Sequence, residues 1–241
     1  MAKDDTGRLH VTVKSGGKRK LSSKLWLERQ LNDPYVTQAK RDGYRSRAAY
    51  KLLEIDDKYR FLKMNQSVVD LGAAPGGWSQ IAAKRVGAAE GRGKVVAIDL
   101  LEMPEIAGVT FAQMDFLADD APGKLRAMLG GRADVVMSDM AANTTGHRKT
   151  DQLRILGLVE GAAAFACEVL KPGGTFLAKV FQSGADATLV TQLKRDFATV
   201  RHVKPAASRQ DSSERYVLAS GFRGSNERPD TSEDDGDQPS R

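Results

Sequence analysis

The feature that most constrains how this chain can fold is a glycine-rich stretch at residues 68–78, which reads Val-Val-Asp-Leu-Gly-Ala-Ala-Pro-Gly-Gly-Trp. Its β-branched start predicts a buried strand, and its glycines let the backbone turn sharply and a ligand approach closely. A helix is predicted to follow at residues 78–85, and its first N–H groups favour an anionic or hydroxyl-rich partner. Such a turn by itself is weak evidence for a nucleotide-like cofactor.

After Ser67, short apolar runs alternate with longer stretches of helical periodicity, which is typical of repeated β-α units and a mostly parallel sheet. The predicted strands are residues 67–71, 94–100, 109–113, 133–138, 174–181, 199–204 and 215–220. The predicted helices are residues 78–85, 123–129, 151–170 and 187–197, and Pro172-Gly173-Gly174 is expected to end the longest one. The pattern indicates an α/β fold with one seven-stranded, mostly parallel sheet flanked by helices.

The two ends of the chain differ from its middle in composition. Residues 1–24 are rich in Lys, Arg, Ser and Gly and are predicted to form a flexible basic extension. Residues 25–222 are predicted to form one domain, which begins with two or three short helices at residues 25–60. Residues 223–241 lack large apolar side chains and are predicted to be a disordered acidic tail that the chemistry does not need.

The basic charge of the chain is concentrated at its beginning. The net charge is +6, and residues 1–51 contain 13 Lys or Arg against 5 Asp or Glu. A basic segment on a nearly neutral body favours nucleic-acid binding, because lysine and arginine neutralise phosphates. A solvated segment that only aids solubility is the alternative.

Several classes of protein do not fit the composition. The single cysteine, Cys167, cannot form a disulfide within the chain and lies in an apolar helical pattern, so a core role is expected. The three histidines, His10, His147 and His202, are far apart, and no metal site is predicted. No apolar run is long enough to span a bilayer, so we expect a cytoplasmic protein without a membrane partner.

Three aspartates follow predicted strands, where the ligands of an open parallel sheet bind. Asp99, Asp115 and Asp139 come at or just after the ends of the second, third and fourth strands. Asp99 lies 22 residues beyond Gly77, close to the spacing at which a carboxylate accepts hydrogen bonds from nucleoside ribose hydroxyls. The alternative for each is an aspartate that only stabilises a turn.

The glycine-rich stretch is neither a Gly-x-Gly-x-x-Gly dinucleotide motif nor a phosphate-binding P-loop. Residues 70–78 instead resemble the cofactor motif of the FtsJ-type S-adenosylmethionine-dependent RNA 2'-O-methyltransferases. Four further motifs resemble that family and occur in its order: Arg-Ser-Arg-Ala-Ala-Tyr-Lys-Leu at 45–52, Met-Ser-Asp-Met-Ala at 137–141 with Asn143, Lys-Val-Phe-Gln at 179–182 and Ser-Glu-Arg-Tyr at 213–216. The resemblance implies a Rossmann-like methyltransferase fold for the domain at residues 25–222.

The resemblance implies a catalytic set of two lysines and two carboxylates, namely Lys51, Asp139, Lys179 and Glu214. Methyl transfer needs the ribose 2'-oxygen in line with the methyl group and the departing sulfur, so positioning supplies much of the catalysis. We expect Lys179 to orient or deprotonate the hydroxyl, with the carboxylates holding the lysines and Lys51 assisting. A lysine has an ordinary pKa of about 10.4 and accepts a proton only where its surroundings lower that pKa.

The resemblance also implies how S-adenosylmethionine is bound. Gly76 and Trp78 are expected to contact its methionine end through the turn, Asp99 its ribose hydroxyls and Asp115 its adenine amino group. Asp139 is expected near the methionine portion or the transferred methyl group. For Trp78, packing in the core is the alternative.

RNA rather than DNA is the expected substrate, because only RNA carries a 2'-hydroxyl. Arg41, Arg45 and Arg47 are expected to bind its phosphates. A close likeness to the bacterial rRNA branch of the family implies a uridine in the aminoacyl-site loop of 23S rRNA, methylated on the 50S subunit late in assembly. A monomer is expected, because the bulk of the RNA must reach an open edge of the sheet. Methylation of transfer RNA, a noncatalytic RNA-binding or assembly role, and a nicotinamide-dependent oxidoreductase remain the alternatives.

Overall fold

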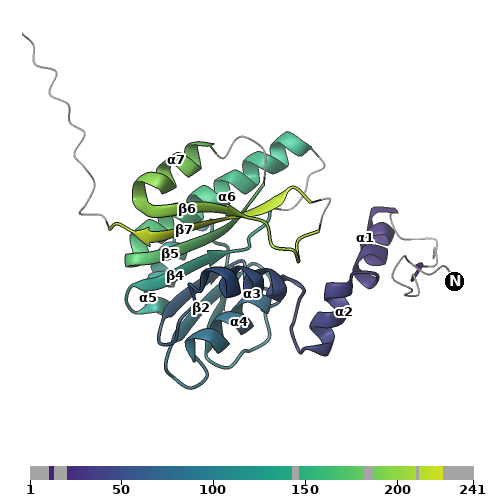
Figure 1. Cartoon of the computed structure of the whole chain (residues 1–241), viewed down its shortest axis with the longest axis horizontal. Helices are drawn as coiled ribbons and strands as arrows, with labels where there is room; N and C mark the ends of the chain where they lie inside the picture. Colours follow the sequence, from purple (N-terminus) through teal and green to yellow (C-terminus); the bar gives the residue numbers. More distant parts are fainter. Residues whose placement is uncertain (1–10, 14–20, 143–146, 182–186, 210–211, 225–241) are drawn as a thin grey trace, which may run out of the picture.

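The computed structural model describes residues 11–13, 21–142, 147–181, 187–209 and 212–224. Seven strands form one sheet in the order β3-β2-β1-β4-β5-β7-β6 (Figure 1). The strands are β1 (Ser67–Leu71), β2 (Lys94–Asp99), β3 (Val109–Gln113), β4 (Ala133–Ser138), β5 (Leu170–Phe181), β6 (Phe197–Val203) and β7 (Glu214–Phe222). Strands β1 to β5 pair in parallel, whereas β7 runs antiparallel to both β5 and β6. The prediction of an α/β fold with a mostly parallel sheet is confirmed.

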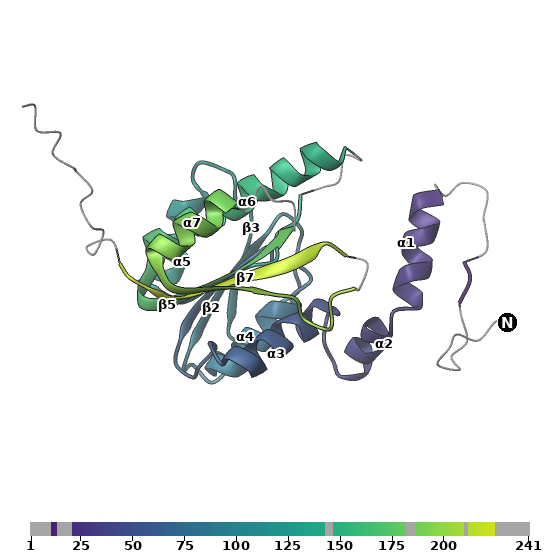
Figure 2. The same cartoon turned by 45° about the horizontal axis from the view of Figure 1, so that its top comes forward.

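Helices cover both faces of the sheet (Figures 1 and 2). The seven helices of the described residues are α1 (Leu21–Leu31), α2 (Pro34–Arg41), α3 (Ala48–Tyr59), α4 (Gly77–Val86), α5 (Ala121–Leu129), α6 (Arg148–Val169) and α7 (Ala187–Asp196). None of these described helices has both the length and the apolar character that crossing a bilayer requires.

Successive residues of the central strands point to opposite faces, and each face has its own core. Val69 and Val136 pack on the side of α5, α6 and α7, while Val68, Val135 and Leu177 pack on the side of α3 and α4. Burial on both faces explains why these strands read as continuous apolar runs rather than as alternating ones.

The bounds of β1, β3 and β4 are those predicted from the sequence. Helix α6 ends at Val169, one residue before its predicted end and just before Pro172-Gly173-Gly174, but these three residues already lie within β5, which begins at Leu170 and not at the predicted residue 174. The pairing of β4 with β5 shifts register between Ala133 and Val135, opposite this stretch, and Gly173 has a φ of +82°. An irregularity at the start of a strand accommodates a proline that lacks an N–H, which explains how the strand can begin before Pro172.

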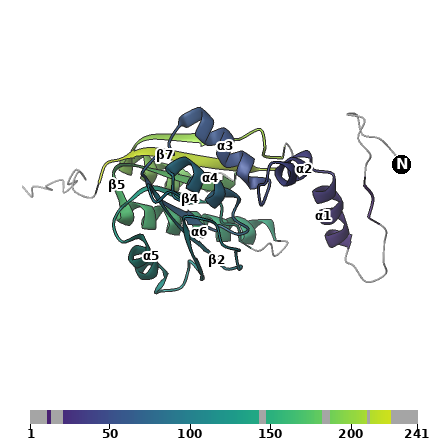
Figure 3. The same cartoon turned by 90° about the horizontal axis from the view of Figure 1, so that it is seen from below.

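Helices α1 and α2 extend from one end of the sheet (Figures 1 and 3). Together with α3 they form the short helices expected at residues 25–60, and α1 begins at Leu21, inside the predicted flexible extension. Asp33 caps α2 by accepting a hydrogen bond from the Tyr35 N–H, with Pro34 in the first helical turn. Most of the predicted extension and nearly all of the predicted tail lie outside the described residues.

Candidate active site

The predicted catalytic residues meet at the carboxyl edge of the parallel strands. Asp139 directly follows β4 and Lys179 lies near the end of β5. Glu214 opens β7, which starts at this edge because it runs antiparallel to β5. Lys51 reaches the same edge from the first turn of α3. Chain segments that are distant in sequence thus converge where an open sheet binds its ligands.

Lys179 and Asp139 form a buried ion pair. The Lys179 ammonium lies 3.1 Å from Asp139 Oδ1 and donates a hydrogen bond of 2.6 Å to the Asp139 carbonyl. Only 7% of Lys179 is exposed. A charge this deeply buried requires a partner, and the carboxylate and carbonyl of one residue satisfy two of the three ammonium N–H groups.

Lys51 and Glu214 form a second ion pair beside the first. The Lys51 ammonium lies 2.6 Å from Glu214 Oε1, and the Ser208 hydroxyl donates to the same oxygen at 3.2 Å. The Glu214 backbone N–H donates to the Ser212 hydroxyl, which helps to hold the start of β7. The structure therefore brings all four predicted catalytic side chains together.

Tyr216 joins the two ion pairs, and sequence reasoning missed its role. Its hydroxyl lies 2.9 Å from Asp139 Oδ1 and accepts a hydrogen bond of 3.3 Å from Lys51. The side chain is fully buried, and burial, together with the charges of Asp139 and Glu214, raises the pKa of Tyr216 well above its usual range. The phenol therefore stays protonated and donates to the Asp139 carboxylate. Tyr216 stands two residues after Glu214, the spacing that puts strand residues on one face, and this signal could have identified it.

The glycine-rich turn between β1 and α4 has a backbone that only glycine adopts readily. Gly72 has a φ of +79° and Gly76 a φ of +108°. A Cβ at Gly72 would lie 2.7 Å from Met140 Cγ and 2.9 Å from Met140 Cα, so the turn passes directly over the residue that follows Asp139. The turn is in this way packed against the catalytic loop.

Asp99 holds the glycine-rich turn in place. Its Oδ2 accepts a hydrogen bond of 2.9 Å from the Ala74 N–H and its Oδ1 one of 2.8 Å from the Leu101 N–H. Asp99 therefore does stabilise a turn, which was the alternative to a ligand-binding role. Each of its carboxylate oxygens also keeps a further lone pair that can accept a hydrogen bond from a ligand. Asp115 is exposed beyond β3 and accepts a hydrogen bond from the Leu117 N–H.

Asp70, a second residue missed from the sequence, lies beneath the turn. It is fully buried, and the Ser79 hydroxyl donates a 2.6 Å hydrogen bond to its Oδ2. Burial raises the pKa of Asp70 to about 7 against the effect of that hydrogen bond, and the charges of Asp139 and Asp99 raise it further. Its Oδ1 has no hydrogen-bond partner within the described parts of the chain.

Trp78 lies in the core between α3 and the sheet. Its indole N–H donates a 2.9 Å hydrogen bond to the Ala48 carbonyl, and its ring lies 5.6 Å from the ring of Tyr216. The core-packing alternative describes this side chain. Any contact of Trp78 with a cofactor would come from its backbone.

The three predicted RNA-binding arginines have different surroundings. The side chain of Arg41 is 75% exposed and, among the described residues, pairs only with the neighbouring Asp42. Arg45 donates to the carbonyls of Pro104 at 2.5 Å and Glu105 at 2.6 Å, and so ties the start of α3 to the loop after β2.

Arg47 is 14% exposed in its side chain, forms an ion pair with Asp33 and donates to the Ala207 carbonyl. Arg45 and Arg47 thus have structural partners. Their part in RNA binding stays a prediction.

No group of three or more His, Cys, Asp or Glu side chains in the described parts of the chain is arranged to hold a metal ion. Cys167 is partly buried, packs against the main core and lies with its Sγ 3.9 Å from Asp196 Oδ2.

Comparison with known proteins identifies the family. The family model of FtsJ-like methyltransferases matches residues 44–222. The Ribosomal RNA large subunit methyltransferase E of Afipia carboxidovorans is 88% identical over 224 residues, which cover 93% of this chain and 100% of that protein. The protein of the same name from Bradyrhizobium diazoefficiens is 84% identical over 224 residues, covering 93% of this chain and 98% of its own.

Among solved structures, a Plasmodium falciparum protein described as a ribosomal RNA methyltransferase aligns with a TM-score of 0.66 and 32% identity. The alignment covers 75% of this chain and 100% of that one. The resemblance inferred from the sequence motifs is confirmed: the chain belongs to the FtsJ-like methyltransferase family.

Proposed function

We propose that this protein transfers the methyl group of S-adenosylmethionine to the 2'-hydroxyl of a uridine in the aminoacyl-site loop of 23S rRNA, on the 50S subunit late in its assembly. Family membership and the names of the close relatives support an rRNA 2'-O-methyltransferase. The observation that carries the proposal is the continuous network Lys51–Glu214–Tyr216–Asp139–Lys179 beside the glycine-rich turn.

Residues around the turn have the chemistry that S-adenosylmethionine requires. The backbone at Gly76 and Trp78 would hold its methionine end, and the free lone pairs of Asp99 would accept from its ribose hydroxyls. Met103 and Ile106 lie against Gly76 and offer apolar surface for the adenine. Asp115 would accept a hydrogen bond from the adenine amino group. When bound, the cofactor supplies an electrophilic methyl group on a positively charged sulfur.

Lys179 is the residue proposed to act on the ribose hydroxyl. Two of its N–H groups are directed to Asp139, which leaves the third to fix the lone pairs of the 2'-oxygen along the line of attack. Asp139 holds the lysine, and Tyr216 holds Asp139. Lys51 and Glu214 complete the network on the side from which a nucleotide would approach.

A small hollow of about 140 Å³ supports that direction of approach. It adjoins the Lys51–Glu214 pair and lies between α1 and the loop that precedes β7, lined by Gln30, Arg47, Lys51, Arg209, Ser212 and Glu214. Three of these side chains are cationic, and their charge is partly offset because Lys51 pairs with Glu214 and both Arg47 and Arg209 pair with Asp33. Arg41, at the end of α2, is a further exposed cation that we expect to bind a phosphate.

The test uses labelled S-adenosylmethionine with three substrates: 50S subunits that lack this modification, free 23S rRNA, and transfer RNA. We expect label on a uridine 2'-oxygen of the 50S subunit, located by mapping the modified nucleoside. Label on a base would contradict the reaction, and preferential labelling of transfer RNA would establish the alternative substrate. Cofactor binding without label on any RNA would establish the noncatalytic role. Gel filtration with light scattering tests the expected monomer.

A further inference from the structure

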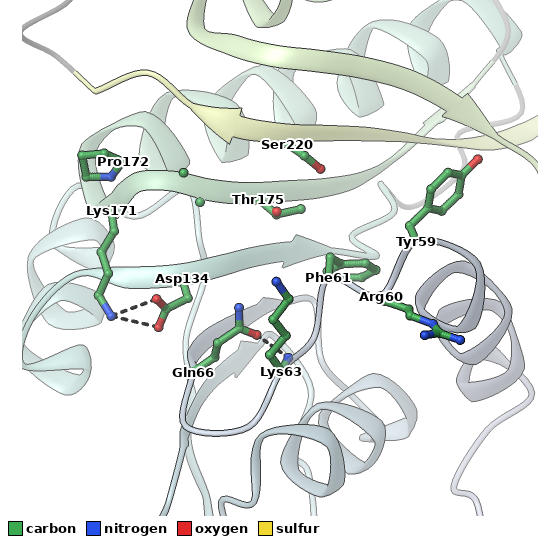
Figure 4. A pocket seen from close by; sticks show the side chains of 12 residues that line it. Tyr59, Arg60, Phe61, Lys63, Gln66, Asp134, Lys171, Pro172, Thr175 and Ser220 are labelled. Carbon is green, nitrogen blue, oxygen red and sulfur yellow. Dashed lines mark hydrogen bonds and ion pairs between the residues drawn. The ribbon is translucent and has the colours of Figure 1, made fainter.

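A second polar pocket lies at the opposite edge of the sheet from the catalytic network (Figure 4). It has a volume of about 340 Å³ and lies between the end of α3 and the starting ends of β1, β4 and β5. Neither the catalytic network nor the glycine-rich turn contributes a residue to it.

The pocket and the catalytic network share one face of the sheet. Across β5 and β7, Lys179 pairs with Tyr216, Leu177 with Leu218, and Thr175 with Ser220. The polar ends of this row are separated by one buried leucine pair, over about 13 Å for four residues of strand. A ligand in the pocket is therefore too far away to contact the reacting ribose.

The charges around the pocket leave an excess of cations. The one carboxylate of its lining, Asp134, is neutralised by the Lys171 ammonium, which lies 2.9 Å from both of its oxygens. Neither the Lys63 ammonium nor the Arg60 guanidinium has a carboxylate partner among the described residues. These cations also offset the partial negative charge at the end of α3.

Several side chains that face the pocket carry hydrogen-bond donors without partners among the described residues. Thr175 is only 7% exposed, yet neither its hydroxyl nor that of Ser220 has a hydrogen-bond partner within the described residues. In Figure 4 both hydroxyls and the Lys63 ammonium point toward the middle of the pocket. Gln66 accepts from the Lys63 backbone N–H at 2.6 Å, so its amide NH₂ is available to donate. An ammonium, two hydroxyls and an amide suit a tetrahedral oxyanion.

We propose that this pocket binds a phosphodiester group of the substrate RNA, at a nucleotide remote from the methylated ribose. The proposal rests on the rRNA substrate proposed above. Basic side chains continue beyond the pocket, since Lys58 lies 5.4 Å and Arg201 5.9 Å from the centre of the Tyr59 ring. Because these cations extend outside the pocket, they suit the successive phosphates of an RNA strand better than a single free anion.

The first test measures RNA affinity of the full-length protein as a function of salt, in Lys63→Ala, Thr175→Val and Lys194→Ala. Lys194 is an exposed lysine of α7, outside the pocket, so its variant controls for the loss of one charge. Lys63→Ala should weaken binding about threefold to tenfold and reduce the slope of log K against log salt by about one. Thr175→Val should weaken binding without changing the slope. The KM for RNA should rise in both, with kcat unchanged. Equal affinities and slopes for Lys63→Ala and Lys194→Ala would overturn the proposal.

The second test titrates inorganic phosphate into the isotopically labelled protein and follows backbone amide signals by NMR. Saturable shifts at Thr175 and Ser220 that are lost in Lys63→Ala support the pocket. Such shifts together with unchanged RNA affinity would assign the pocket to a free phosphate compound and overturn the RNA assignment. Absence of saturable shifts would overturn an oxyanion site. If the unsubstituted protein methylates no rRNA, the proposed function fails, but the phosphate titration still reports on the pocket.

Discussion

The Tyr216 hydroxyl lies 2.9 Å from Asp139 Oδ1, and this hydrogen bond connects two ion pairs into one network. Without it, the Lys179–Asp139 pair and the Lys51–Glu214 pair would be separate. Tyr216 itself contacts no reacting atom, but it positions Asp139 and, through Asp139, the proposed catalytic lysine Lys179.

Replacing Tyr216 by phenylalanine should lower kcat about tenfold or more while leaving the affinity for S-adenosylmethionine nearly unchanged. The ring would still pack against Trp78, but Asp139 would lose its hydrogen bond at a cost of about 1–3 kcal/mol in the free energy of unfolding. Single-turnover methylation and calorimetric titration measure the two effects. Tyr44→Phe is the control, because Tyr44 lies outside both the catalytic network and the second pocket. A kcat equal to that of the control would show that Tyr216 only fills space.

Replacing Lys179 by alanine should reduce methyl transfer by at least about a hundredfold, because the 2'-oxygen loses the group that orients it. Cofactor affinity should stay within about twofold of the unsubstituted protein. Lys179→Met, which keeps the apolar stem, should be equally inactive, and this separates the chemistry from any packing defect. Lys124→Ala removes a surface lysine paired with Asp120 and should have no effect. Retained turnover in both Lys179 variants would remove this residue from the central role.

Gly72→Ala should weaken cofactor binding and destabilise the protein by about 1–3 kcal/mol. Its Cβ would come within 2.9 Å of the Met140 backbone, in addition to the strain of a φ of +79°. Gly43 is a matched control, because its φ is +78° and no atom lies within 4 Å of its added Cβ. Gly43→Ala therefore reports the backbone strain alone. Equal losses of stability and cofactor affinity in the two variants would contradict a steric role for Gly72.

Asp70 should make the free energy of unfolding depend on pH. Its carboxyl has a pKa of about 7 when folded, against an ordinary value of 3.8, so the folded state holds a proton that the unfolded chain releases between these values. Its contribution to stability is therefore full below about pH 3.8 and is lost as the pH rises to about 7. Relative to Asp70→Asn, the protein should lose on the order of a few kcal/mol across this range.

Urea denaturation at a series of pH values measures the Asp70 effect as a difference between the protein and Asp70→Asn, in which the titrations of the other groups largely cancel. Asp57→Asn, with a side chain that is 67% exposed, is the control. A difference that stays flat from pH 4 to pH 7 would contradict a buried, protonated Asp70.

Arg41→Ala should affect RNA binding, whereas Arg47→Ala should affect the stability of the fold. Arg41→Ala should weaken RNA binding and lower its salt dependence without changing stability, because the side chain is exposed. Arg47→Ala should destabilise the protein by about 3–5 kcal/mol, because it leaves Asp33 buried with fewer partners. Thermal unfolding and RNA binding distinguish the two. If Arg47→Ala weakened RNA binding at unchanged stability, its contact with Asp33 would be of little structural importance.

The four residues of the predicted catalytic set could be proposed from the sequence because each lies in a short motif with a recognisable neighbourhood. Tyr216 and Asp70 could not be assigned in this way, although both lie within or beside such motifs. Their roles depend on partners that only folding brings close, since the Tyr216–Asp139 contact spans 77 residues and the Lys51–Glu214 contact spans 163. No local pattern encodes which of several buried polar groups will meet.

The sequence by itself determined the α/β class, the bounds of β1, β3 and β4, the glycine-rich turn and the family, because apolar runs buried on both faces and glycine-rich turns are local signals. The tertiary structure decided which cations are free to meet a phosphate and which are held by carboxylates. Arg45 and Arg47 look alike in sequence to Arg41, but the folded chain directs the first two to carbonyls and to Asp33. It also gathers Lys63, Thr175 and Ser220 from three elements into one pocket. Burial and pairing are properties of long-range packing, so only the folded chain could assign these roles.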